Sequence, residues 1–255
     1  GETVAGGPYA IGQGTLAVNG NYTISFTGAN FTVTPATLNV VADGRTKIYG
    51  DADPALTFVA TGFKFSDTAA TVLTGGLTRT PGETVVGGSY AIGQGTLTAN
   101  GNYAISFTGA NFTITPATLN VVADARSKIY GDADSALTFA VTGFKFSDTA
   151  ATVLTGGLTR AAGENVAGGP YAIGRGTLAA NSNYIINFTG ANFTITPATL
   201  NVVADARTKV YGDADPALTF AATGFKFSDT AATVLTGGLA RAPGETVAGG
   251  PYAIG

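Results

Sequence analysis

The sequence predicts a tandem array of small, mostly β domains, each with one short helix. The chain has 255 residues, of which 37 are Gly and 40 are Thr, while only 11% are charged. This composition favours strands and tight turns over long charged helices. A string that starts GETVAGG at Gly1 returns with few changes at Gly82, Gly163 and Gly244, a period of 81 residues. Such a period is too long for one coil of a solenoid and suits a small domain.

Apolar residues alternate with polar ones through most of one repeat, which is the pattern of half-buried strands. The expected strands, in chain order, are Leu38–Ala42, Leu56–Phe58, Phe63–Phe65, Tyr90–Ile92, Thr96–Thr98, Tyr103–Phe107 and Phe112–Thr115. Lys64 then points outward from its strand. Asn100-Gly101 predicts a type I′ hairpin turn, and Thr108–Asn111 predicts a four-residue loop between two strands.

One short helix interrupts the strands. Ser66 and Asp67 can cap a helix over Thr68–Leu73, and Gly75-Gly76 ends it. The strand–strand–helix–strand order favours a β-grasp-like sheet with the helix packed across it; an immunoglobulin-like sandwich is the alternative. The expected core side chains, with equivalents 81 residues later, are Leu38, Val40, Leu56, Phe58, Phe65, Leu73, Leu77, Ile92, Leu97, Ile105, Phe107, Phe112 and Ile114.

The prolines at 35, 116 and 197 predict where one repeat ends and the next begins. Each lies between two extended runs, where a residue without a backbone N–H cannot continue a ladder. This phase gives the C-terminal part of a repeat at 1–35, complete repeats at 36–116 and 117–197, and a truncated N-terminal part at 198–255.

The link between complete repeats is short and stiff. Only Thr115–Thr118 joins them, and its proline also restricts the residue before it. We therefore expect neighbouring repeats of the same chain to be the main partners of each repeat, with limited bending between them. A compact domain of 81 residues has a radius of gyration of roughly 12 Å.

The composition excludes most classes of enzyme. His, Cys, Met and Trp are all absent, which removes imidazole bases, thiol nucleophiles and metal sites with nitrogen or sulfur ligands. No nucleophile-elbow or phosphate-loop string occurs, so no catalysis is expected. The net charge of −3 offers no basic footprint for nucleic acid. No apolar run is long enough for membrane insertion of this segment.

Several strings resemble the MBG ("mostly beta, glycine-rich") repeat, and the most specific is Tyr-Gly-Asp-x-Asp-Pro at residues 49–54. The other matching strings are Gly62-Phe63, Asp67–Gly75, Tyr90–Ile92, Asn102–Phe107 and Phe112–Pro116. One departure is Ser135, which stands where Pro54 and Pro216 stand in the other copies. The resemblance implies a stalk on the cell surface or in a secreted protein, because such repeats occur in large bacterial surface proteins of the filamentous-haemagglutinin adhesin type.

An acidic cluster in each repeat is the best candidate for ligand chemistry. Calcium takes six to eight oxygen ligands, and three carboxylates with loop carbonyls could supply them. The calcium candidates are Asp43, Asp51 and Asp53 with their equivalents Asp124, Asp132, Asp134, Asp205, Asp213 and Asp215. Arg45 and Lys47 interrupt this stretch, so Asx turns and surface ion pairs are the favoured interpretation, with no metal or other cofactor.

Tyr49, Tyr90 and Tyr103 could instead line a carbohydrate-binding face, although alternation places Tyr90 and Tyr103 in the core. The sequence therefore predicts a structural stalk or spacer of an extracellular bacterial adhesin or matrix fibre. The alternative is a multivalent module that binds carbohydrate or calcium weakly at each repeat. Strand addition between chains is a further expectation, because 1–35 and 198–255 carry complementary parts of a repeat.

Overall fold

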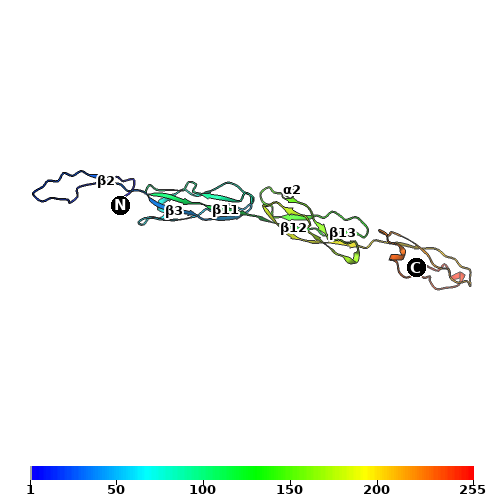
Figure 1. The fold of residues 1–255 in the computed structure, drawn as a ribbon. Helices are drawn as coiled ribbons and strands as arrows, with labels where there is room; N and C mark the ends of the chain where they lie inside the picture. Colours follow the sequence, from blue (N-terminus) through cyan, green and yellow to red (C-terminus); the bar gives the residue numbers. More distant parts are fainter. Residues whose placement is uncertain (1) are drawn as a thin grey trace. The chain divides into compact units, whose positions relative to one another are not determined.

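The computed structural model describes residues 2–255 and is rich in strands (Figure 1). Its helices are single turns: α1 (Ala69–Val72), α2 (Ala150–Val153) and α3 (Ala231–Val234), with 3-10 turns η1 (Val166–Gly168) and η2 (Val247–Gly249). The prediction of a mainly β array with short helices is confirmed. No helix within residues 2–255 is both long and apolar enough to cross a membrane.

The strands up to residue 116 are β1 (Tyr9–Ile11), β2 (Ala29–Phe31), β3 (Ala36–Ala42), β4 (Arg45–Ile48), β5 (Phe58–Thr61), β6 (Leu73–Thr74), β7 (Thr78–Arg79), β8 (Ser89–Gly93), β9 (Thr98–Ala99), β10 (Tyr103–Thr108) and β11 (Ala110–Thr115). The later strands are β12 (Ala117–Ala123), β13 (Arg126–Ile129), β14 (Phe139–Thr142), β15 (Leu154–Thr155), β16 (Thr159–Arg160), β17 (Tyr171–Gly174), β18 (Ala179–Ala180), β19 (Tyr184–Thr189), β20 (Ala191–Thr196), β21 (Asn201–Ala204) and β22 (Phe220–Thr223).

The chain forms two compact units that interleave in sequence. The first unit comprises Gly1–Leu119, Gly143–Val153 and Ala180–Ile185, and the second comprises Asn120–Thr142, Leu154–Ala179 and Ile186–Gly255. Segments of one 81-residue repeat therefore pack with the repeat before it. The boundaries proposed at the three prolines stay a prediction, because packing of this kind does not mark where a repeat starts.

Within residues 36–116 the strands form two larger sheets. One has the order β10-β3-β5 and the other has the order β4-β11-β8-β7, with β6 and β9 as a small pair. β3 and β11 lie within one bundle of strands in Figure 1. Two sheets and a one-turn helix fit the sandwich alternative better than a single sheet crossed by a helix. Residues 117–197 repeat the pairings of β12 with β14, β13 with β20, and β17 with β16 and β20.

Two long strands each take part in both sheets. β3 continues as β4, β10 continues as β11, and the two run parallel with the same register in both halves. The buried positions are even-numbered in β3, as at Leu38 and Val40, but odd-numbered in β4, as at Lys47. One irregular point flips the side chains and moves the strand between sheets. In the last strand that point is Gly109, where a Cβ would lie 2.7 Å from the Ile92 carbonyl oxygen.

Each sheet has its own small core. The first groups Leu38 and Val40 of β3 with Tyr103 of β10, Val72 of α1 and Leu97. In the second copy, the core of the other sheet consists of Ala123, Tyr171, Ile173, Phe193 and Ile195. Most of the predicted core is therefore confirmed, and alternation along the strands is the reason.

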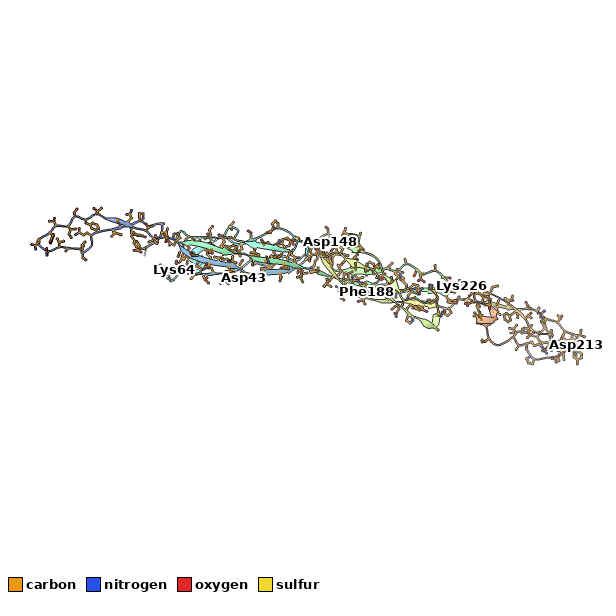
Figure 2. All side chains as sticks on the ribbon, viewed as in Figure 1. Asp43, Lys64, Asp148, Phe188, Asp213 and Lys226 are labelled. Carbon is orange, nitrogen blue, oxygen red and sulfur yellow. The ribbon has the colours of Figure 1, made fainter. Side chains whose placement is uncertain are left out.

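Phe65 is a wrong core prediction. The expected strand Phe63–Phe65 is absent: Phe63 packs against the core, whereas Phe65 is fully exposed in a left-handed turn at φ 55°. Three alternating residues were too few to distinguish a strand from a turn. Lys64 between them is exposed, as predicted (Figure 2). The expected strand at Leu56–Phe58 also begins later, at Phe58.

The helix and both predicted turns differ in detail. α1 is capped by Thr68, which shares a capping box with Thr71, rather than by Ser66 and Asp67. The Asn100 carbonyl accepts a hydrogen bond from the N–H of Tyr103, so the turn exists, but Gly101 has no positive φ and type I′ is wrong. The predicted loop at 108–111 is also wrong, because the strand continues through Gly109 in unbroken parallel register.

Candidate functional site: the junction between repeats

Tyr49 is the centre of the junction in the first unit. It follows β4, its N–H donates to the carbonyl of Thr115 at 2.8 Å, and its side chain is only 7% exposed. The ring makes edge-on contacts with Phe146 and Tyr184, both at centroid distances of 5.3 Å. Both partners lie in the next copy of the repeat. One aromatic side chain therefore extends from one repeat into the following one.

Asp148 joins the two tyrosines of this junction. Its Oδ2 accepts a hydrogen bond from the Tyr49 hydroxyl at 3.0 Å and another from the Tyr184 hydroxyl at 2.6 Å. Burial and the hydrogen bond to this carboxylate raise the pKa of Tyr49, and the same causes raise the pKa of Tyr184 to about 12. Both hydroxyls thus remain protonated donors to a carboxylate.

The flank of the junction is fixed by backbone geometry and charge. Gly50 has φ 84°, and a Cβ on it would lie 2.5 Å from the Cβ and Cγ of Lys145. Glycine is therefore required twice, for the left-handed backbone and for the close approach of the lysine. Lys145 Nζ reaches Asp51 Oδ1 at 2.9 Å. A further hydrogen bond joins the two copies, from the N–H of Val85 to Asn183 Oδ1 at 2.9 Å.

The loop that receives Tyr49 has the same backbone conformation with and without a tyrosine packed against it. Phe146 has a left-handed φ of 52°, which is rare for a bulky residue. Phe65 at the same position of the preceding copy has φ 55° and is fully exposed, with no ring packed against it. The loop therefore holds this phenylalanine outward by itself, as a preorganised surface for the tyrosine.

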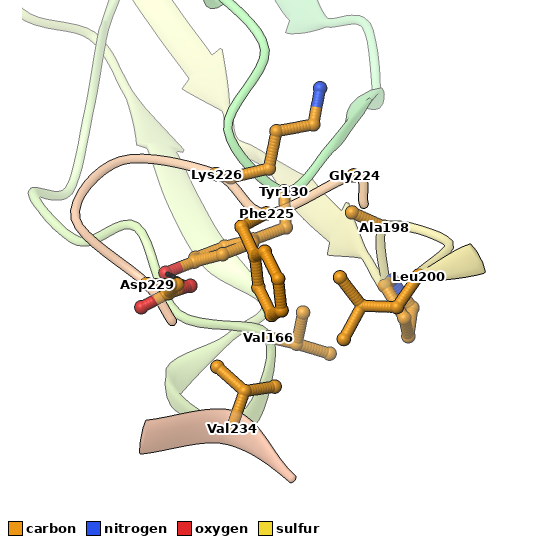
Figure 3. A pocket seen from close by; sticks show the side chains of 10 residues that line it. Tyr130, Val166, Ala198, Leu200, Gly224, Phe225, Lys226, Asp229 and Val234 are labelled. Carbon is orange, nitrogen blue, oxygen red and sulfur yellow. Dashed lines mark hydrogen bonds between the residues drawn. The ribbon is translucent and has the colours of Figure 1, made fainter. Parts of the chain in front are cut away.

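The second unit contains a second junction of the same kind. Tyr130 makes an edge-on contact with Phe227 at 5.3 Å, and its hydroxyl donates to Asp229 Oδ2 at 3.0 Å. Lys226 pairs with Asp132 at 3.1 Å. A cavity of about 230 Å³ lies beside Tyr130, and Figure 3 shows the tyrosine hydroxyl next to Asp229 at its edge.

A network of four charged side chains includes Lys47 of β4, the strand that precedes Tyr49. Lys47 is buried, and its Nζ contacts Asp53 Oδ1 at 2.6 Å and Glu83 Oε2 at 2.5 Å. Arg79 bridges the same two carboxylates, each at 2.5 Å. The hydrogen bond from Arg79 is the main cause that lowers the pKa of Asp53 to about 2, although burial opposes it. Burial lowers the pKa of Lys47, but its two carboxylate partners outweigh this and raise it.

The guanidinium of Arg79 also covers aromatic rings. It lies 4.7 Å from the ring centroid of Phe112 and 5.5 Å from that of Tyr90. The charges of the network balance, and its members already satisfy one another. The same network recurs in the later copies with Lys128, Asp134, Arg160 and Glu164, and with Lys209, Asp215, Arg241 and Glu245.

The structure does not bring the three predicted calcium candidates together. Asp43 accepts a hydrogen bond from Thr57 beside Arg45, Asp51 pairs with Lys145 across the junction, and Asp53 belongs to the ion network. Their equivalents have matching partners: Asp124 with Thr138, Asp132 with Lys226, Asp134 with Arg160, Asp205 with Thr219 and Asp215 with Arg241, while Asp213 has its backbone carbonyl beside Lys209. Within residues 2–255 no group of three or more side chains could hold a metal ion.

The three tyrosines proposed for carbohydrate do not form an exposed platform. Tyr49, Tyr90 and Tyr103 are each buried, the first in the junction and the other two in the cores. Tyr90 donates to the carbonyl of Thr84 at 2.8 Å, and Tyr103 donates to Asp67 Oδ2 at 2.7 Å. The inward positions predicted for Tyr90 and Tyr103 are thus confirmed.

Sequence reasoning missed the receiving half of the junction, which consists of Lys145, Phe146, Asp148 and Tyr184. Lys145, Phe146 and Asp148 lie almost a hundred positions after their partners, and Tyr184 lies still further along the chain, so no local pattern connects them. A usable signal existed in the repeat itself. The Tyr-Gly-Asp string and the Phe-Lys-Phe-Ser-Asp string recur in every copy although neither fits a buried strand face.

The family to which the chain belongs agrees with this geometry. The family model for the MBG domain (YGX type) matches residues 38–113, 119–194 and 200–255. No curated protein and no solved structure shows significant similarity to the chain. Tyr49-Gly50 and its equivalents supply the Tyr-Gly pair in that description. The first two of these pairs form the junctions described above. The three matched ranges cover most of the sequence, and the chain therefore belongs to the MBG domain family of the YGX type.

Proposed function

We propose that the array is a structural stalk or spacer of a large bacterial surface or secreted protein, lies outside the cell and catalyses no reaction. The observation that carries this proposal is the junction, in which Tyr49 inserts between Phe146 and Tyr184 of the next repeat. A residue of one copy thereby packs against a buried tyrosine of the following copy. Family membership supports the same conclusion, since the MBG domain is a structural repeat.

The junction restricts motion because its contacts act across a very short link. Each aromatic pair contributes about 0.5–1.5 kcal/mol beyond the area it buries. The tyrosine–aspartate hydrogen bond and the Lys145–Asp51 ion pair lie on the same interface. Only Thr115–Thr118 joins the two repeats, so little chain is available to absorb a rotation. On this proposal the partners of a repeat are its neighbours in the chain, and neither nucleic acid nor a membrane is a partner.

Small-angle scattering of the full chain tests the proposal. A single globule of 255 residues would have a radius of gyration of roughly 18 Å, whereas three repeats in line, each about 35–40 Å across, would give about 30 Å. We expect the larger value for the natural chain. The double variant Tyr49→Ala/Tyr130→Ala should sample bent arrangements and give a smaller mean value with the same circular dichroism. A natural chain near the globular value would overturn the stalk.

The proposed location needs its own experiment. Antibodies against residues 1–255 should label intact cells that produce the protein, and external protease should remove the signal. Labelling only after the cells are permeabilised would contradict an extracellular stalk, whatever the scattering shows.

A further inference from the structure

The first and last long strands of a repeat are hydrogen-bonded to each other along most of their length. β3 pairs with β10 over six residue pairs and β4 pairs with β11 over four, always in parallel. Two further bonds extend this ladder, from the N–H of Ala36 to the carbonyl of Asn102 at 2.9 Å and from the N–H of Tyr49 to the carbonyl of Thr115 at 2.8 Å. The ladder therefore reaches both points where the chain enters and leaves the repeat.

Parallel terminal strands have a specific mechanical consequence. Tension in the chain pulls the first strand at its N-terminal end and the last strand at its C-terminal end. In a parallel pair these ends lie at opposite ends of the ladder, so the strands are pulled past each other along their common axis. The evenly spaced bonds of a parallel ladder then share the load and must break together. Strands pulled apart from one end would instead lose their bonds one after another.

We propose that the β3–β10 and β4–β11 ladder is a shear clamp that gives each repeat its resistance to tension. This inference rests on the proposed stalk function, because only a chain under tension needs such a device. It adds a specific property to that function: the repeat withstands force applied through its two ends better than force applied in any peeling direction.

Side chains reinforce the clamp where the last strand leaves it. Lys47 on β4 is buried within the network of Asp53 and Glu83. The Thr115 hydroxyl of β11 donates to the carbonyl of Lys47 at 3.2 Å. Phe112 of β11 is fully buried with the Arg79 guanidinium over its ring. Sliding of β11 along β4 would therefore separate buried charged and aromatic groups as well as backbone bonds.

The second copy has the same arrangement. β13 and β20 pair in parallel over four residue pairs with the register of β4 and β11. The N–H of Tyr130 donates to the carbonyl of Thr196 at 2.8 Å, and the N–H of Ala117 donates to the carbonyl of Asn183 at 3.0 Å. Both ends of the ladder are thus extended as they are in the first copy, so the clamp is a property of the repeat.

Single-molecule pulling in two directions tests the clamp. The chain has no cysteine, so two introduced thiols define where force is applied to the full-length protein. Thr34→Cys with Thr118→Cys loads the repeat along the ladder. Thr34→Cys with Gly101→Cys pulls the N-terminal ends of β3 and β10 apart. Gly101 is suitable because a Cβ there meets no atom within 4 Å and its φ is not left-handed.

We expect a rupture force several-fold lower in the peeling direction than in the shear direction at the same pulling speed. Melting curves of the two unattached variants should coincide, which shows that both are folded. A matched pair then locates the resistance: Val40→Ala on β3 and Val72→Ala on α1 remove the same atoms from buried sites. Val40→Ala should lower the shear force, and Val72→Ala should leave it nearly unchanged because forced unfolding depends on the barrier at the clamp.

Equal rupture forces in the two directions would overturn the clamp, as would equal losses for the two valine variants. These outcomes differ from failure of the stalk. A globular scattering profile with a strong directional difference would refute the stalk and keep the clamp. A long scattering profile with no directional difference would keep the stalk and refute the clamp.

Discussion

Removal of a single hydroxyl from Tyr49 should weaken the first junction by a predictable amount. Tyr49→Phe keeps the ring contacts with Phe146 and Tyr184 but deletes the bond to Asp148. Asp148 keeps its second donor, Tyr184, so the carboxylate is not left without a partner. The loss should therefore be that of one ordinary hydrogen bond, about 1 kcal/mol of unfolding free energy. The first compact unit has fewer than 150 residues, so this lowers the melting temperature by about 4 °C.

The repeat supplies matched controls for this measurement. Tyr211 occupies the same position in the third copy but is 70% exposed, so Tyr211→Phe should change the unfolding free energy by less than about 0.5 kcal/mol. Tyr130 donates to Asp229 at 3.0 Å, and within residues 2–255 no second side chain donates to that carboxylate, so Tyr130→Phe should cost at least as much as Tyr49→Phe. Thermal and urea unfolding of the three variants are compared with the natural chain. The reasoning is refuted if Tyr49→Phe and Tyr211→Phe are indistinguishable.

High pH provides a second readout of the same contact. Burial, followed by the hydrogen bond to Asp148, raises the pKa of Tyr49, and the pKa of Tyr184 rises to about 12. Their contribution to stability is complete below the ordinary tyrosine pKa of about 10 and is lost as the pH rises toward 12. Tyr49→Phe should therefore reduce the alkaline loss of stability, and Tyr211→Phe should not.

Four further outcomes are expected. Gly50→Ala should destabilise the chain more than Gly212→Ala. Both residues have a left-handed φ, but a Cβ would meet Lys145 only at Gly50. Equal losses of unfolding free energy would show that the close approach to Lys145 has no effect. Phe65→Gly and Phe146→Gly both replace a bulky residue at a left-handed φ by glycine. The two variants should therefore differ in unfolding free energy only by the ring contact of Phe146 with Tyr49, which is about 0.5–1.5 kcal/mol. The hydrogen bond from Arg79 is the main cause that lowers the pKa of Asp53 to about 2. The contribution of Asp53 to the free energy of unfolding is therefore present above the unfolded pKa near 3.8 and is lost as the pH falls toward 2. Asp53→Asn should reduce the loss of stability at acid pH. Excess calcium or a chelator should leave the melting temperature unchanged, and a calcium-dependent rise would restore the binding alternative.

The strand positions were predictable because their signal is local. Alternation of apolar and polar residues identifies Leu38, Val40 and Phe112 as inward without any knowledge of the fold, and all three are fully buried. The parallel ladder was not predictable. Its partners are distant in sequence, and the switch of each long strand between sheets reverses the alternation at single irregular points. Because the alternation reverses at Gly109, the local pattern predicts a loop there instead of a continuous strand.

The candidate site shows the same division between local and distant information. The Tyr-Gly-Asp string was recognised as distinctive, but its aspartates were considered as calcium ligands within one repeat. The structure places Asp51 against Lys145 of the next copy and Asp53 in a network within its own copy. Two aspartates of one string thus have different roles: Asp51 contacts the next copy, and Asp53 contacts its own copy. Alternation around Lys64 predicts an inward Phe65, whereas the left-handed turn holds its side chain outward, as at Phe146.

The junction makes two consecutive copies the smallest unit in which the tyrosine and its receiving residues meet. Each copy contributes the tyrosine at one end and the receiving phenylalanine, lysine and aspartate at the other. Within residues 2–255, Phe65 and Tyr211 have no such partner. Where their counterparts Phe146 and Tyr49 meet in the first junction, the tyrosine is buried and the phenylalanine is less exposed than Phe65 but still 66% exposed. Stability in such a chain grows with each added neighbour, as in arrays governed by nearest-neighbour interfaces. Near-identity of the copies then has a physical reason, because a change at either end of a repeat alters its fit to every adjoining copy.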